Sequence, residues 1–121
     1  MSVNELLYRP AVDRFLRALV PVEETLGLPL TLTLAAVALE PGLSVNDLAS
    51  RINAPQQSAS RYVAVLQGRY AMPGRDLGPV PLIAIEVSPT DPRRRALQLT
   101  PAGVARLSRI LKTLSTNSND K

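Results

Sequence analysis

The chain has 121 residues, of which 45% are hydrophobic, so it is long enough to fold as one domain around a buried core. It contains no cysteine and no histidine, which excludes a disulfide framework and a Cys/His zinc site and removes the commonest general base. The net charge is +4 at pH 7, and we expect neither a cofactor nor a metal.

The positive charge is concentrated in the second half of the chain. Residues 51–112 hold ten basic residues, nine of them arginine, and three acidic ones, a net charge of +7. The rest of the chain holds four basic and seven acidic residues, a net charge of −3. This asymmetry favours a polyanionic partner, and arginine suits bidentate contacts with phosphate and guanine. The alternative is a basic surface that is merely solvated.

The first 29 residues predict a helical segment. Ser2 and Glu5 have the spacing of a capping box. Pro10 is expected either to kink the helix or to start a new one, Pro21 to add a second kink, and Gly27 with Pro29 to end the segment. We expect residues 1–29 to take part in dimerisation, or else to pack on their own domain. No basic and then apolar leader starts the chain, and the apolar run 28–39 is too short for a membrane span. We therefore expect a cytoplasmic protein without a membrane partner.

Two short helices are predicted next. Thr31 is the expected N-cap of the first, whose residues 32–39 are apolar nearly all round and should lie at the centre of the core. Ser44 is the expected N-cap of the second, in which apolar residues recur at i, i+3, i+4 and i+7 between residues 45 and 52. Asn53 suits the reversal that follows, because asparagine tolerates a left-handed backbone.

The next helix, residues 55–67, is the predicted recognition helix of a helix-turn-helix. Pro55 suits its first turn, and apolar positions between residues 59 and 66 form its buried face. Gln can pair with adenine, Arg with guanine, and Ser with phosphate or bases. The alternative is an ordinary amphipathic surface helix. The polar side chains expected to point outward and read DNA are Gln56, Gln57, Ser58, Ser60 and Arg61.

A Gly- and Pro-rich connector and a β-hairpin follow. Residues 68–81 contain three Gly and three Pro and predict irregular structure; Arg69 and Arg75 are candidates for extra DNA contacts, or part of an idle surface loop. Strands over 82–87 and 95–99 would flank a basic tip, residues 88–94, and form a wing. We expect Leu97 and Leu99 on one face of the second strand and Arg95 on the other.

The last predicted helix covers residues 100–114, and it completes the fold. Thr100 is its expected N-cap, with Pro101 at the first position. One apolar face is expected to hold Val104, Leu107, Leu111 and Leu114, with Ile110 beside them. Residues 115–121 are expected to be a disordered tail. The order of elements predicts a mainly α-helical chain with a small β-hairpin (α+β), a winged helix-turn-helix domain over residues 30–114.

Three segments resemble the MarR-type family of winged helix-turn-helix transcriptional regulators. The motif DPR at 91–93, followed after five residues by LTPAG at 99–103, is similar to their signature from the wing to the last helix. PGLSVNDLA at 41–49 resembles the segment before their recognition helix, and SRYV at 60–63 resembles a segment within it.

The resemblance implies binding of double-stranded DNA by a two-fold dimer, with the recognition helix in the major groove and the wing on the minor groove or the backbone. It places Arg93 at the minor groove, supported by Asp91, and gives phosphate contacts to Arg94 and Arg95. The alternative for Arg93 is a solvent-exposed arginine paired with Asp91. That family usually ends in a long extra helix that completes the dimer. Here we expect the dimer contacts from residues 1–29 and from the helix over 100–114.

The sequence thus predicts a dimeric DNA-binding transcriptional regulator, a repressor that acts at a palindromic site. Two alternatives stay open: a winged-helix protein-interaction subunit or adaptor, and a DNA-binding protein of plasmid or phage replication or partition. An enzyme is not expected, because no paired carboxylates and no phosphate-binding glycine motif are present. The family resemblance also raises a small-molecule effector, for which the sequence reveals no pocket.

Overall fold

Five helices and one β-hairpin make up the described residues of the computed structural model, which are 3–75, 77–87, 90, 91, 93 and 95–119. The predicted fold, mainly α-helical with a small hairpin, is confirmed. The elements in chain order are α1 (Val3–Thr25), α2 (Leu28–Leu39), α3 (Val45–Arg51), α4 (Gln56–Leu66), β1 (Ile83–Val87), β2 (Arg95–Leu99) and α5 (Pro101–Asn119).

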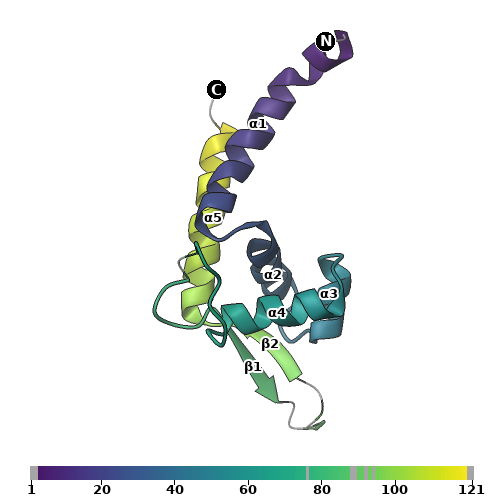
Figure 1. Cartoon of the computed structure of the whole chain (residues 1–121), viewed down its shortest axis with the longest axis vertical. Coiled ribbons are helices and arrows are strands. Elements are labelled where there is room, and N and C mark those ends of the chain that lie inside the picture. Colours follow the sequence, from purple (N-terminus) through teal and green to yellow (C-terminus); the bar gives the residue numbers. More distant parts are fainter. Residues whose placement is uncertain (1–2, 76, 88–89, 92, 94, 120–121) are drawn as a thin grey trace.

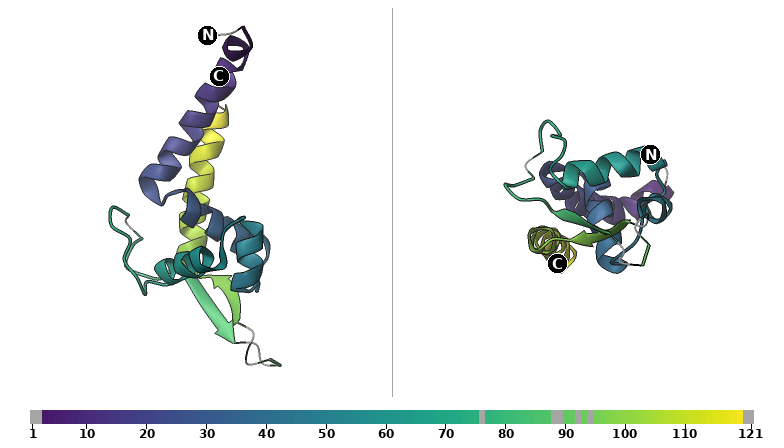
Figure 2. Two further views of the ribbon diagram at one scale, coloured as in Figure 1. Left: turned by 45° about the vertical axis from the view of Figure 1, so that its right-hand side comes forward. Right: turned by 90° about the horizontal axis from the view of Figure 1, so that it is seen from below.

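The molecule has a helical arm and a smaller head. Helices α1 and α5 pack side by side and run away from the head, so both ends of the chain lie at the far end of the arm (Figure 1). The head holds α2, α3, α4 and the hairpin, and the hairpin projects from it at the end opposite to the termini (Figure 2). We call these four elements the reading head.

The junction of α1 and α2 differs from the prediction. Pro10 and Pro21 both lie inside one continuous helix. Helix α2 begins at Leu28, not after Thr31, because Pro29 starts a helix well and Thr31 instead donates its hydroxyl to the carbonyl of Gly27 at 2.8 Å. No described helix is by itself long and apolar enough to cross a membrane; α1 from residue 9 and α2 qualify together, but they meet at a bend of 92°.

The core lies where α2 crosses beneath α4 and the hairpin. Leu30, Leu34 and Val37 of α2 are buried there, as predicted for the centre of the core. Leu39, however, is 85% exposed, and Leu32 is also exposed, so α2 is apolar on its outer side as well. The largest fully buried apolar residues outside α2 are Leu26, Leu48, Val63, Val65, Leu66, Ile83 and Leu97.

The turn between α3 and α4 follows the local sequence signals. The Ser44 hydroxyl accepts the backbone N–H of Asp47 at 3.1 Å and so caps α3 as predicted. Asn53 has a φ of 55°, the left-handed conformation expected for it. Pro55 precedes α4 as the N-cap residue and does not occupy its first turn, a shift of one position from the prediction.

The strands pair antiparallel, with Val87 opposite Arg95, Ile85 opposite Leu97 and Ile83 opposite Leu99. Side chains alternate along a strand, so Arg95 lies on the same face as Leu97. The prediction that placed Arg95 on the opposite face was wrong. Arg95 is exposed because it lies at the outer end of β2, where the hairpin has left the core.

Helix α5 is longer than predicted, and only part of its predicted apolar face is buried. The Thr100 hydroxyl accepts the N–H of Gly103 at 3.0 Å, which confirms the N-cap. Leu107 and Ile110 are buried, whereas Val104 and Leu111 are more than half exposed. The helix continues to Asn119, where a disordered tail was expected, because no Gly or Pro follows Leu114 to end it.

We expect Gly103→Ala to destabilise the fold by about 2 kcal/mol, since overpacking that moves backbone typically costs ~1–3 kcal/mol. A Cβ at Gly103 would lie 2.1 Å from the carbonyl oxygen of Leu82, so α5 would have to move away from the start of β1. Urea unfolding at fixed protein concentration measures the change, with the exposed Ser108→Ala on the same helix as control. A stabilised Gly103→Ala variant would contradict this packing, because alanine normally favours a helix.

Candidate DNA-binding surface

The outward side chains of α4 are confined to its first half. Gln56, Gln57, Ser60 and Arg61 are exposed, whereas Ser58 is only partly so. The second half of the helix, residues 63–66, is buried on all sides. The polar side chains that could reach bases are therefore gathered in the first two turns, the part of a recognition helix that contacts base edges in helix-turn-helix complexes.

The start of α4 leaves room for an anion. Pro55 makes no side-chain cap hydrogen bond to the first turn, unlike Ser44 in α3. The backbone N–H groups of the first turn, together with the helix dipole, favour a negatively charged partner such as a phosphate. The same turn could then bind a phosphate through its backbone N–H groups and contact the DNA through the side chains of Gln56 and Gln57.

The wing presents basic side chains at the end of the reading head that lies opposite to the termini. Arg93 and Arg95 are exposed, and Arg94 lies outside the described residues. Asp91 supports the wing through the backbone: its Oδ1 accepts the N–H of Arg93 at 3.1 Å. This Asx-type turn shapes the chain at Arg93 and leaves the guanidinium out of the bond. This backbone contact differs from the alternative given above, in which the side chain of Arg93 pairs with Asp91.

Backbone hydrogen bonds fix the wing relative to α4. The N–H of Gly42 donates to the carbonyl of Leu97 at 2.8 Å, and the N–H of Leu97 donates to the carbonyl of Leu43 at 3.0 Å. At the base of the hairpin, the N–H of Leu82 donates to the carbonyl of Leu66, the last residue of α4, at 2.8 Å. Backbone hydrogen bonds therefore join the hairpin both to the end of α4 and to the segment before α3.

The two connector arginines have different surroundings. Arg69 is exposed just beyond α4 and donates its Nε to Gln67 Oε1 at 3.0 Å. Arg75 is turned toward the arm: it donates to both the carbonyl and the carboxylate of Glu23 near the end of α1. The structure thus separates Arg75 from the residues of α4 and the wing with which it was grouped.

Glu23 is held in its charged form by these contacts. The hydrogen bond from Arg75 lowers the pKa of Glu23 below its ordinary value, and the backbone N–H of Leu28 and the charge of Arg75 act in the same direction. Because the pKa is depressed in the folded protein, the contact contributes above the ordinary pKa of a glutamate. It is lost as the pH falls through the lowered value.

A second ion pair, not predicted from the sequence, braces the turn before α3. Arg51 donates its Nε to Glu40 Oε1 and its Nη2 to Glu40 Oε2, the latter at 3.1 Å. The hydrogen bond from Arg51 is the main reason why the pKa of Glu40 is lowered. Both side chains are about half exposed, so the pair orients the turn more than it stabilises the fold.

Helix α1 carries an apolar stripe that its own chain leaves uncovered. Val12, Phe15, Leu16 and Val20 are between 46% and 61% exposed and recur at helical spacing on one side of the arm. Val104 and Leu111 of α5 are exposed as well. Apolar side chains gathered in this way are typical of a protein–protein contact surface.

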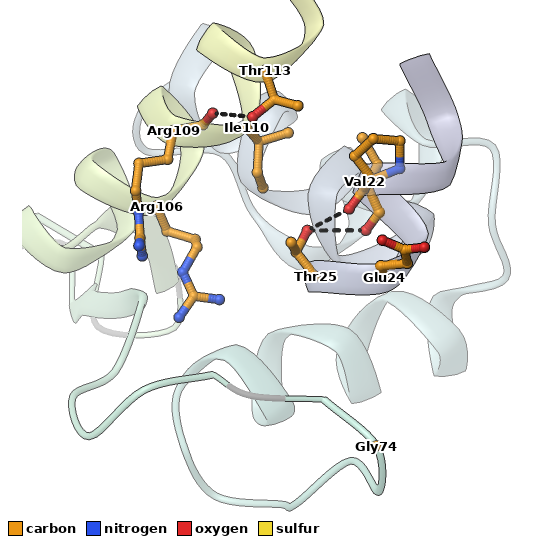
Figure 3. A pocket seen from close by; sticks show the side chains of 9 residues that line it. Val22, Glu24, Thr25, Gly74, Arg106, Arg109, Ile110 and Thr113 are labelled. Carbon is orange, nitrogen blue, oxygen red and sulfur yellow. Dashed lines mark hydrogen bonds between the residues drawn. The ribbon is translucent and has the colours of Figure 1, made fainter. Parts of the chain in front are cut away.

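A cleft of about 540 Å³ lies between the end of α1, the connector and α5. Figure 3 shows the guanidinium groups of Arg106 and Arg109 extending from α5 toward the connector loop that carries Gly74. Val22 and Ile110 add apolar surface. Glu24 lines the cleft as well, so the two cations and the apolar wall suit a small organic anion on the side of α5 that carries the arginines. Its lining comes from three distant segments, which explains why the sequence revealed no pocket.

Comparison with solved structures finds matches over nearly the whole chain. A variant of MepR from S. aureus has a TM-score of 0.74 at 18% identity, over 96% of this chain and 78% of that one. The PcaV transcriptional regulator from Streptomyces coelicolor has a TM-score of 0.66 at 22% identity, over 98% of this chain and 79% of that one. The transcriptional repressor CouR, bound to a 23-mer DNA duplex, has a TM-score of 0.65 at 24% identity, over 96% and 75%.

Two further matches are described as MarR-family transcription regulators. SP03579 has a TM-score of 0.61 at 20% identity, over 95% of this chain and 68% of that one, and a regulator from Silicibacter pomeroyi has a TM-score of 0.61 at 21% identity, over 94% and 70%. No protein-family model matches the sequence, and no curated protein matches it by sequence. At identities below 25% the likeness concerns the fold, and at that level the predicted resemblance is confirmed.

Proposed function

The chain has the winged helix-turn-helix fold of MarR-family transcription regulators, and from this premise we propose that it is a dimeric repressor that binds double-stranded DNA. The recognition helix α4 lies in the major groove and the wing lies on the minor groove or its phosphates. The residues that read base edges are Gln56, Gln57, Ser60 and Arg61, together with the partly exposed Ser58. The DNA backbone is bound by Arg93, Arg94 and Arg95.

The observation that carries this proposal is that backbone hydrogen bonds join the hairpin to the end of α4 and to the segment before α3. The exposed polar turns of α4 and the exposed arginines of the wing belong to one unit, joined by the Leu43–Leu97 and Leu66–Leu82 backbone bonds. A duplex bound by both α4 and the wing would be contacted in two neighbouring grooves. An arginine on a narrow hairpin suits the electronegative minor groove.

The dimer in this proposal forms through the arm. The apolar stripe of α1 and the exposed apolar side chains of α5 meet the same surfaces of a second copy in a two-fold arrangement. The two reading heads then face one palindromic site. A small organic anion in the cleft beside Arg106 and Arg109 would touch α1, the connector and α5 together, which makes the cleft the place for an effector.

Binding of the purified protein to duplex DNA tests the proposal. Affinity is expected to fall steeply with salt, because phosphate contacts release counterions. Arg93→Ala should weaken binding to all duplexes alike and reduce the salt slope by about 1 for each subunit. Arg14→Ala, which removes the same charge from an exposed position of α1 outside the apolar stripe, is the control. If no duplex is bound at low salt, the proposal is wrong.

A further inference from the structure

The connector (residues 68–81) is anchored at both sides of Arg75. Met72 and Leu77 are partly buried against the core, and the backbone N–H of Arg75 closes a turn on the carbonyl of Met72 at 3.1 Å. The Arg75 side chain is 22% exposed, low for a loop arginine. The segment is therefore a fitted part of the structure, and it presents one cation toward α1.

Arg75 holds the end of α1. Its Nη1 donates to the carbonyl oxygen of Glu23 and its Nη2 to the Glu23 carboxylate. Carbonyls in the last turn of a helix lack a partner within the helix, and a cation there is also favoured by the helix dipole. The guanidinium covers Gly27 as well, since a Cβ on that buried glycine would lie 3.1 Å from Nη2.

The same carboxylate reaches α2, because Glu23 Oε2 accepts the N–H of Leu28 at 3.4 Å. One arginine thus joins the end of α1 and the start of α2 to the connector. The connector in turn is continuous with α4 on one side and β1 on the other. We call this contact between Arg75 and Glu23 the clasp. It lies between the arm, which carries the apolar stripe, and the reading head.

We propose that Arg75 is a positioning residue, whose clasp with Glu23 sets the angle between α1 and the reading head and so the separation of the two recognition helices in the dimer. The proposal rests on the proposed function. A dimer of this kind binds two half-sites at a fixed spacing. A loosened clasp would weaken binding to the correctly spaced palindrome and relax discrimination against other spacings, while each head would contact its half-site as before.

The test compares Arg75→Gln, Glu23→Gln, the double variant and Arg14→Gln, a matched loss of one positive charge at an exposed position of α1. Dissociation constants are measured for the palindrome selected by the purified protein, the same palindrome with two central base pairs added, and a single half-site. Arg75→Gln and Glu23→Gln should each weaken palindrome binding about fivefold or more, as typical coupling energies imply. The double variant should lose no more affinity for the palindrome than either single variant does. Half-site binding in all variants and spacing preference in Arg14→Gln should stay unchanged.

A direct DNA contact by Arg75 predicts a different pattern. Arg75→Gln would then weaken half-site binding too, whereas Glu23→Gln, which removes a negative charge, would leave binding unchanged or strengthen it. That pattern, or an unaltered spacing preference in both variants, would overturn the proposal.

Amide hydrogen exchange separates failure of the clasp from failure of the proposed function. If the wild-type protein binds no duplex DNA, only the proposed function fails. Both Arg75→Gln and Glu23→Gln should still speed exchange at Leu28 and along the connector in a folded protein. Unchanged exchange rates at these amides would show that the contact between Arg75 and Glu23 does not stabilise this region.

Discussion

Phe15→Asp is expected to make the protein monomeric in solution and to weaken its binding to a palindromic duplex by about a hundredfold or more. Phe15 is 61% exposed at the centre of the apolar stripe on α1. In a two-fold dimer a carboxylate there would be buried without a partner in both copies, which is strongly unfavourable. A monomer loses the gain in affinity that comes from two linked heads on one site.

Sedimentation equilibrium across a range of concentrations measures the change in assembly. Arg14→Gln is the matched control, because it alters the charge of α1 by the same amount at an exposed polar position. Circular dichroism confirms that both variants keep their helices. A Phe15→Asp protein that remains dimeric would place the interface elsewhere, and one that binds the palindrome as tightly as the wild type would remove the need for a dimer.

Arg61→Ala is expected to weaken binding to the selected site about tenfold or more and to relax the preference at one base pair in each half-site. A bidentate arginine–guanine contact is worth ~1–3 kcal/mol of discrimination, and the dimer contains two copies of the residue. Arg61 is exposed in the first two turns of α4, so its removal should leave the core intact. Binding to unrelated duplexes at low salt should change little.

Arg61→Lys distinguishes readout of a base from attraction to phosphate. Lysine keeps the charge and loses the planar fork, so this variant should retain non-specific binding while it loses the base preference. Competition assays with single base-pair changes across the site give the preference directly. Equal loss for every sequence in Arg61→Ala, with full rescue by lysine, would make Arg61 a backbone contact.

The local features of the fold could be predicted because their causes lie within a few residues. The caps at Ser44 and Thr100, the left-handed Asn53 and the strand over 95–99 all follow from neighbouring side chains. Thr31 shows the limit of such signals. It is a good cap in isolation, but Pro29 starts the helix earlier and Thr31 lies within it.

Features set by long-range packing could not be predicted. Helical spacing places Val104, Leu107 and Leu111 of α5 on one apolar face, but packing against neighbouring elements decides that Leu107 is buried while Val104 and Leu111 are exposed. Arg75 was grouped with the DNA contacts because it lies in the basic half of the chain. Its partner, Glu23, is 52 residues away, and no local pattern connects the two.

The candidate site shows the same division. The outward residues at the start of α4 follow from helical periodicity, and four of the five are exposed. The bonds of Leu97 with Gly42 and Leu43, which fix the wing beside α4, depend on backbone groups that carry no signature in the sequence. They became visible only in the folded chain.

Selection of duplexes from a random library by the purified protein tests the proposed function most directly. We predict enrichment of a palindrome with half-sites about 10–10.5 base pairs apart, centre to centre, bound in a strongly salt-dependent manner. Enrichment of an unpaired half-site alone would contradict the dimer. No enrichment of any sequence, or binding that does not respond to salt, would contradict a DNA-binding repressor.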